Sequence, residues 1–69
     1  MNDFQKFIEL LKSFGCTDDF STPGTNKYEI NHNKDYICVT LFEGRGYSGF
    51  HGTFTFDKQG KAMSYGLWE

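Results

Sequence analysis

The spacing of apolar residues changes once along this chain, and that change limits the folds it can adopt. Between Asp3 and Phe14 the apolar residues recur every three or four positions, as on one face of an α-helix. From Lys27 onward they alternate with polar residues, as in strands that bury one face. One helix followed by several strands predicts an α+β fold, with the helix lying across an antiparallel sheet.

The predicted helix covers residues 3–14. Asn2 or Asp3 is suited to cap its first turn, and Gly15 is suited to the left-handed residue that ends a helix. The apolar stripe consists of Phe4, Phe7, Ile8, Leu11 and Phe14, widened by Leu10. Residues 16–26 are polar and contain a Pro-Gly turn signal, so they predict a loop, which we expect Phe20 to hold against the core.

Four strands are predicted, and short loops between them favour a meander. Their ranges are 27–32, 36–43, 50–57 and 61–68. The second strand is apolar on both faces, which is typical of an inner strand. The turn from Asp57 to Gly60 resembles a type I turn closed by a left-handed glycine.

That turn predicts the pairing of the last two strands. Counted from it, the opposed residues are Phe56 with Ala62, Phe54 with Ser64, Gly52 with Gly66, and Phe50 with Trp68. Opposed glycines would leave a shallow spot between Phe50 and Trp68. A shift by one residue would instead place Phe54 beside Tyr65 and remove that spot.

The size and charge of the chain bound what it can do. Its 69 residues make one domain, 1–69, and 19% of them are aromatic, which fills a small core efficiently. The net charge is −2, and Arg45 is the single arginine. Nucleic-acid binding relies on Lys and Arg that neutralise phosphates, so we expect no nucleic-acid partner. No apolar run approaches the roughly 20 residues of a membrane span, so we expect no membrane partner either.

The cysteines and histidines do not indicate a metal or an active site. Cys16 and Cys38 stand alone, with no signal-peptide stretch before them, which predicts two reduced thiols in a cytosolic, cytoplasmic protein. Structural zinc sites bring their ligands in pairs, and neither these cysteines nor His32 and His51 are paired. No nucleophile elbow or phosphate loop occurs, so we expect no enzyme activity, cofactor or metal.

The segment from Phe42 to Phe56 carries five aromatic rings and four glycines. Its part from Arg45 resembles the RNP1 strand of RNA-binding sheets, in which rings stack on bases. The spacing departs from that motif at Ser48, and no second aromatic strand precedes it. We therefore interpret Phe50, Phe54 and Phe56 as the core face of a strand.

The residues left for recognition are Arg45 and Tyr47 in the glycine-rich connection and Trp68 near the end of the chain. Exposed Tyr, Trp and Arg are typical of binding hot spots. In size and composition the chain resembles small accessory proteins of bacteria and their phages. The sequence predicts a non-enzymatic protein-interaction module, adaptor-like or inhibitor-like. The alternatives are single-stranded nucleic-acid binding through stacked rings, and a homo-oligomer or homodimer paired through an exposed edge strand.

Overall fold

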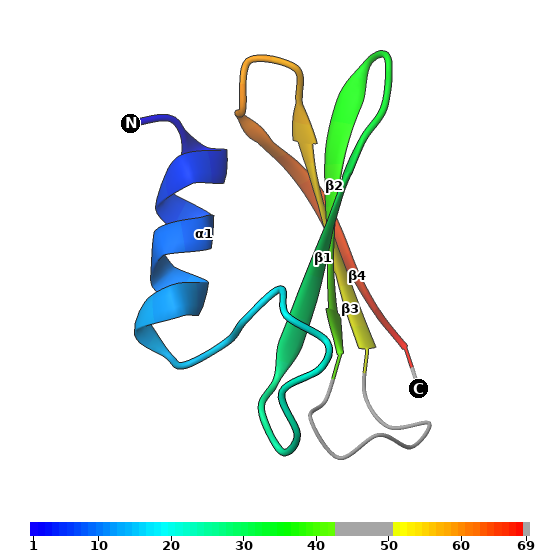
Figure 1. Ribbon diagram of the computed structural model, residues 1–69. Coiled ribbons are helices and arrows are strands. Elements are labelled where there is room, and N and C mark those ends of the chain that lie inside the picture. The colour runs from blue at the N-terminus through cyan, green and yellow to red at the C-terminus, as the bar shows by residue number, and fades with distance from the viewer. Residues whose placement is uncertain (43–50, 69) are drawn as a thin grey trace.

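The computed structural model describes residues 1–42 and 51–68, and it confirms the predicted α+β fold (Figure 1). Helix α1 spans Asp3–Ser13 and is followed by four strands: β1 (Lys27–His32), β2 (Tyr36–Phe42), β3 (His51–Asp57) and β4 (Ala62–Trp68). Each strand pairs antiparallel with the next, in the order β1-β2-β3-β4, so the sheet is the predicted meander with β2 inside it. Glu43 and Phe50, which the sequence placed at strand ends, lie outside the described residues.

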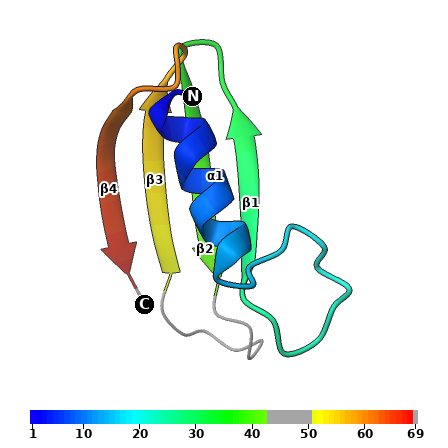
Figure 2. The same ribbon diagram turned by 90° about the vertical axis from the view of Figure 1, so that its left-hand side faces the viewer.

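Helix α1 packs on one face of the sheet and leaves β4 to its side (Figure 2). The buried apolar side chains come from both layers: Leu11 from α1, Tyr28 from β1, Val39 from β2 and Phe56 from β3. Phe7 adds its ring to them, with its centroid 5.6 Å from that of Phe56. The core therefore lies under the helix and above the first three strands.

The helix has a narrower buried stripe than its sequence predicted. Leu10 is 51% exposed and Phe14 is 75% exposed. The helix ends at Ser13, one position earlier than predicted, with Phe14 as its C-cap, and Gly15 follows in the left-handed conformation with φ +85°. Phe14 therefore lies beyond the last residue of the helix, and its ring stays outside the core. Leu10 faces the side of β4, where no helix covers the sheet.

The first residues of the chain are held to the turn between β3 and β4. Asn2 caps α1 by accepting a hydrogen bond from the Gln5 amide at 2.8 Å, and its Nδ2 donates to the Gln59 carbonyl at 3.0 Å. The Phe4 amide donates to the Gly60 carbonyl at 2.8 Å. The Ala62 amide donates to the Asp3 carboxylate at 2.9 Å. We call these contacts of residues 2–4 with residues 59–62 the N-terminal latch.

The turn itself has the predicted geometry. The Gly60 amide donates to the Asp57 carbonyl at 2.8 Å, and Gly60 has φ +86°, the left-handed conformation that favours glycine. The Asp57 carboxylate accepts from the amides of Gln59 and Lys61, at 3.0 and 2.9 Å. Lys61, predicted to begin the last strand, thus belongs to the turn.

The pairing predicted for β3 and β4 is wrong beyond its first pair. Phe56 does lie opposite Ala62, but a β-bulge shifts the register between Thr55 and Phe56. Beyond the bulge Phe54 lies opposite Tyr65. Gly52 lies opposite Leu67 and Gly66 opposite Thr53, so the expected pair of glycines does not form. The proposed pair of Phe50 with Trp68 involves a residue outside the described ranges, and Trp68 lies opposite His51.

The loop from 16 to 26 returns along the outer edge of β1. The Tyr28 amide donates to the Thr17 carbonyl at 3.0 Å, which gives β1 a short parallel bridge on that edge. Phe20 does not reach the core under α1. It remains 55% exposed and meets the edge of the Phe42 ring, with centroids 5.7 Å apart. The loop is thus held to the end of the sheet rather than to the core.

Candidate functional site

The three residues that the sequence proposed for binding are not brought together in the described structure. Arg45 and Tyr47 lie outside the described residues, so their roles stay predictions. Trp68 is the last residue of β4, and its backbone pairs with His51. The structure describes no side-chain position for Trp68. The site must therefore be sought in the described residues themselves.

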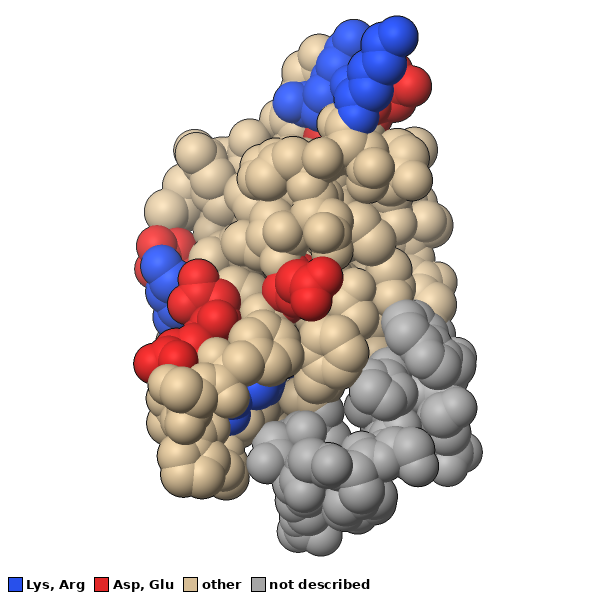
Figure 3. All heavy atoms as spheres, turned by 45° about the vertical axis from the view of Figure 1, so that its right-hand side comes forward, with Lys and Arg blue, Asp and Glu red and all other residues tan. Residues whose placement is uncertain are grey.

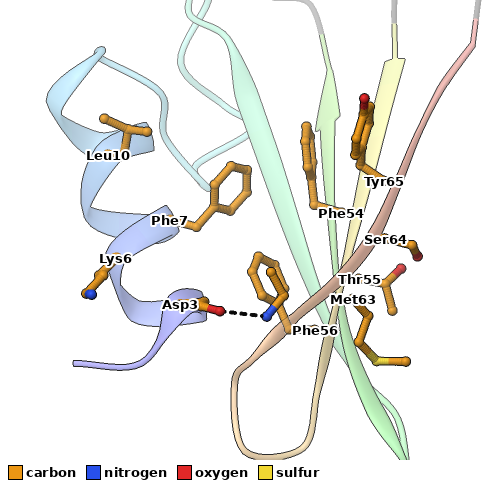
Figure 4. A pocket seen from close by; sticks show the side chains of 11 residues that line it. Asp3, Lys6, Phe7, Leu10, Phe54, Thr55, Phe56, Met63, Ser64 and Tyr65 are labelled. Carbon is orange, nitrogen blue, oxygen red and sulfur yellow. Dashed lines mark hydrogen bonds between the residues drawn. The ribbon is translucent and has the colours of Figure 1, made fainter.

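An apolar groove of about 410 Å³ runs between α1 and β4. It exists because α1 lies over the first three strands, so that the inner face of β4 has no helix above it (Figure 2). Figure 4 shows Phe7 pointing from α1 toward Phe54 and Phe56, with the Tyr65 ring beside Phe54. We call this feature the α1–β4 groove.

Aromatic rings form the floor of the groove. The Phe7 and Phe54 centroids lie 4.7 Å apart, and those of Phe54 and Tyr65 lie 6.1 Å apart with planes inclined by 20°. Tyr65 is nevertheless 73% exposed, and Leu10, on the opposite wall, is 51% exposed. Large apolar side chains that line a groove and stay exposed are typical of sites that bind another molecule.

One end of the groove is polar. Asp3 and Lys6 line it there, on the first turns of α1. The Asp3 carboxylate is already engaged by the Ala62 amide at the start of β4 (Figure 4). The Lys6 ammonium has no hydrogen-bond or ion-pair partner among residues 1–42 and 51–68, and its backbone amide donates to the Asn2 carbonyl within the helix. The groove thus offers an apolar surface with one cation at its end, which suits an apolar ligand better than a phosphate chain.

The β-bulge decides which side chains of β4 enter the groove. Met63 is the extra residue of β4, since Ala62 and Ser64 pair with the neighbouring residues Phe56 and Thr55. Figure 4 shows Met63 and Ser64 projecting away from α1, together with Thr55. If these same residues paired without the bulge, Tyr65 would lie opposite Thr53 and on that far face, because side chains alternate along a strand.

The two edges of the sheet differ in how they are protected. The β1 edge carries Lys27 and Glu29 and is bridged by the loop at Thr17. Strand β4 carries no charged residue from Ala62 to Trp68, and no strand among the described residues pairs with its outer edge. Natural proteins usually protect an edge strand with charge, proline or a covering segment, because its free N–H and C=O groups can pair with another chain. In β4 the bulge and Asp3 protect only the first residues.

The sheet face away from α1 carries little charge. Figure 3 brings this side forward and shows one acidic group in the middle of an otherwise uncharged surface, with further charged groups at the top and at one side. By register, Cys38 lies there between Asn31 and Thr55, and Thr40 lies between Glu29 and Thr53. Of these residues, only Thr55 is among those that line the two pockets beside α1. A second pocket of about 360 Å³ lies instead on the β1 side of the helix, between Phe4, Ile8 and Ile30.

The titratable groups whose pKa values shift lie away from the groove. Burial raises the pKa of the Tyr28 hydroxyl. Hydrogen bonds from Ser21 lower the pKa of the Asp19 carboxyl, with the Ser21 hydroxyl at 2.6 Å. Cys16 and Cys38 are free thiols. The described residues contain no cluster of three or more His, Cys, Asp or Glu side chains that would hold a metal ion.

Comparisons with family models, with curated proteins and with solved structures find no match for this chain. Among the described residues, no helix has the length and apolar character needed to cross a membrane. The site therefore has to be judged from its own geometry.

Sequence reasoning missed the groove and named neither Leu10 nor Tyr65 as a site residue. Leu10 gave a signal, because it widened the helical stripe beyond what one face of a sheet needs to cover. For Tyr65 the sequence offered only the alternative register, shifted by one residue, that places it beside Phe54, and the bulge that produces this pairing was not predicted.

Proposed function

We propose that this protein is a small, non-enzymatic interaction module, of the adaptor or inhibitor kind, that binds another polypeptide along β4. The bound segment is extended and adds to the free edge of the sheet. Its alternate side chains enter the α1–β4 groove. This mode of recognition combines main-chain hydrogen bonds for affinity with side-chain pockets for specificity.

One observation carries the proposal: the apolar groove and the unprotected strand edge lie side by side. A free edge alone attracts any extended chain, and a groove alone would suit many ligands. Tyr65 belongs to both, since it sits on β4 and its ring, 73% exposed, lines the groove. A segment paired with β4 would bring every second side chain to the level of this ring.

The test is a titration of the isotope-labelled protein with a seven-residue peptide that carries large apolar residues at every second position. Amide signals of β4 and of Leu10 should shift. Leu10→Asn should weaken binding about ten-fold, because it removes one apolar wall. Phe20→Asn is the matched control: Phe20 has a similar exposed fraction, 55% against 51%, but contacts Phe42 of β2 and does not line the groove.

Shifts confined to other surfaces, or equal binding by the Leu10 and Phe20 variants, would contradict the proposal. A double variant, Arg45→Ala with Tyr47→Ala, tests the predicted contribution of these two residues in the same titration. Weakened binding without loss of the native circular dichroism spectrum would support it.

A further inference from the structure

The outer edge of β4 has hydrogen-bonding groups that point away from the sheet at defined residues. The Asp57 amide donates to Lys61, so Asp57 faces β4. Backbone groups alternate sides along a strand, so Phe54 and Gly52 direct theirs toward β2. Tyr65 lies opposite Phe54, and Leu67 lies opposite Gly52. The N–H and C=O groups of Tyr65 and Leu67 therefore point out from the edge.

Gly66 lies between these two residues, and nothing among the described residues of one copy requires a glycine there. It does not have a positive φ, and a β-carbon built on it would meet nothing within 4 Å. Glycine inside a strand weakens it by roughly 0.5–1 kcal/mol relative to alanine. Where no turn or crowding demands it, such a glycine often marks the place where another backbone approaches closely.

We propose that β4 pairs antiparallel with β4 of a second copy, about a two-fold axis through Gly66. This inference rests on the proposed function and names the polypeptide that adds to the edge. The axis sets Tyr65 of each copy opposite Leu67 of the other, and each such pair exchanges two hydrogen bonds through the groups that point outward. The pairing avoids the bulge and the Asp3 carboxylate, which both lie at the start of β4.

The charge pattern favours a second copy on this edge. Two identical antiparallel strands place the residue on the axis beside its own equivalent, and a charge there would repel itself. The strand from Ala62 to Trp68 has no charge to repel. The β1 edge, with Lys27 and Glu29 and a bridging loop, lacks this property. In the dimer both helices lie on one face of a continuous sheet, and the two α1–β4 grooves face each other across the Tyr65 rings.

The experiment compares mass and amide exchange of the full chain with those of two variants of Gly66. At concentrations up to about 1 mM, where even weak strand pairing is populated, light scattering should approach twice the 8.0 kDa of one chain. The Tyr65 and Leu67 amides should gain protection from hydrogen exchange as the concentration rises, whereas the Gly66 amide, directed toward β3, should be protected throughout. Gly66→Lys places two ammonium groups beside each other at the axis and should weaken the dimer about ten-fold. Gly66→Thr adds a side chain without charge and should leave the dimer intact.

A mass of 8.0 kDa at every concentration would overturn the inference. So would a dimer that Gly66→Lys leaves unchanged. Both variants should fold, since nothing lies within 4 Å of the added β-carbon, and their circular dichroism spectra check this. If the chain stays monomeric while the apolar peptide still shifts the β4 amides, the second copy is wrong and the proposed function stands. If neither binds, both are wrong.

Discussion

Replacing Gly60 with alanine should break the contacts of Asn2 in the N-terminal latch, because the new β-carbon would clash with the Asn2 side chain. The built β-carbon lies 2.2 Å from Asn2 Nδ2 and 2.4 Å from its Cγ. Asn2 has a flexible side chain and would swing away, and in doing so it would lose its bonds to the Gln5 amide and the Gln59 carbonyl. Loss of the helix cap costs about 1 kcal/mol, and loss of the second bond costs about 1 kcal/mol more.

The left-handed backbone adds a further cost. At φ +86° an alanine is strained by about 1 kcal/mol. The expected loss is therefore about 3 kcal/mol in the free energy of unfolding, a large part of the stability of a domain this small. Urea unfolding followed by circular dichroism measures it.

Gly15→Ala is the matched control for Gly60→Ala. Gly15 has nearly the same φ, +85°, but nothing lies within 4 Å of its added β-carbon. It should lose only the strain, about 1 kcal/mol. In an Asn2→Ala background, Gly60→Ala should also cost only about 1 kcal/mol, because the side chain it displaces is gone. Equal losses for Gly15→Ala and Gly60→Ala, or additive losses for Asn2→Ala and Gly60→Ala, would refute the reasoning.

Three further predictions follow from burial and from the shifted pKa values. Leu11→Ala should lower the free energy of unfolding by about 3 kcal/mol, and Leu10→Ala should lower it by less than about 1 kcal/mol. The difference arises because Leu11 is 6% exposed and Leu10 is 51% exposed, and urea unfolding of the two variants measures it. Burial raises the pKa of Tyr28 in the folded protein above its ordinary 10.0. The stability that Tyr28 contributes is therefore complete below pH 10.0 and is lost as the pH rises toward the raised pKa. In the Tyr28→Phe variant the free energy of unfolding should depend less on pH in the alkaline range. Hydrogen bonds from Ser21 lower the pKa of Asp19 in the folded protein below its ordinary 3.8. The stability that Asp19 contributes is therefore present above pH 3.8 and is lost as the pH falls through the lowered pKa. An NMR titration of the carboxyl should show the lowered pKa, and in the Asp19→Asn variant the free energy of unfolding should depend less on pH in the acid range.

The fold could be predicted from the sequence because each element depends on local spacing. The helical spacing of Phe4, Phe7 and Leu11 and the alternation of Ile37, Val39 and Leu41 need no knowledge of the rest of the chain. The turn at Gly60 was predictable for the same reason, since its residues suit only a few backbone conformations.

The groove could not be predicted, because it depends on how two distant elements sit together. The bulge that turns Tyr65 toward α1 lies beside Ala62, whose amide is bound by Asp3 at the other end of the sequence. No local pattern in β4 encodes that contact. Leu10 was counted as core because its spacing fits the stripe, yet it faces a strand that the helix does not reach.

The N-terminal latch also has a consequence for the order in which this protein folds. Two of its hydrogen bonds connect residues that are separated in the sequence by 57 and 59 positions, whereas each strand of the meander pairs with the next strand along the chain. Closing a long loop is slower than closing a hairpin, so we expect the sheet to form first and the helix to dock last. During synthesis, residues 2–4 cannot form the N-terminal latch until residues 59–62 have been added to the chain. Until then the apolar side of α1 is exposed, which makes the nascent chain most prone to aggregation before residues 59–62 have been added.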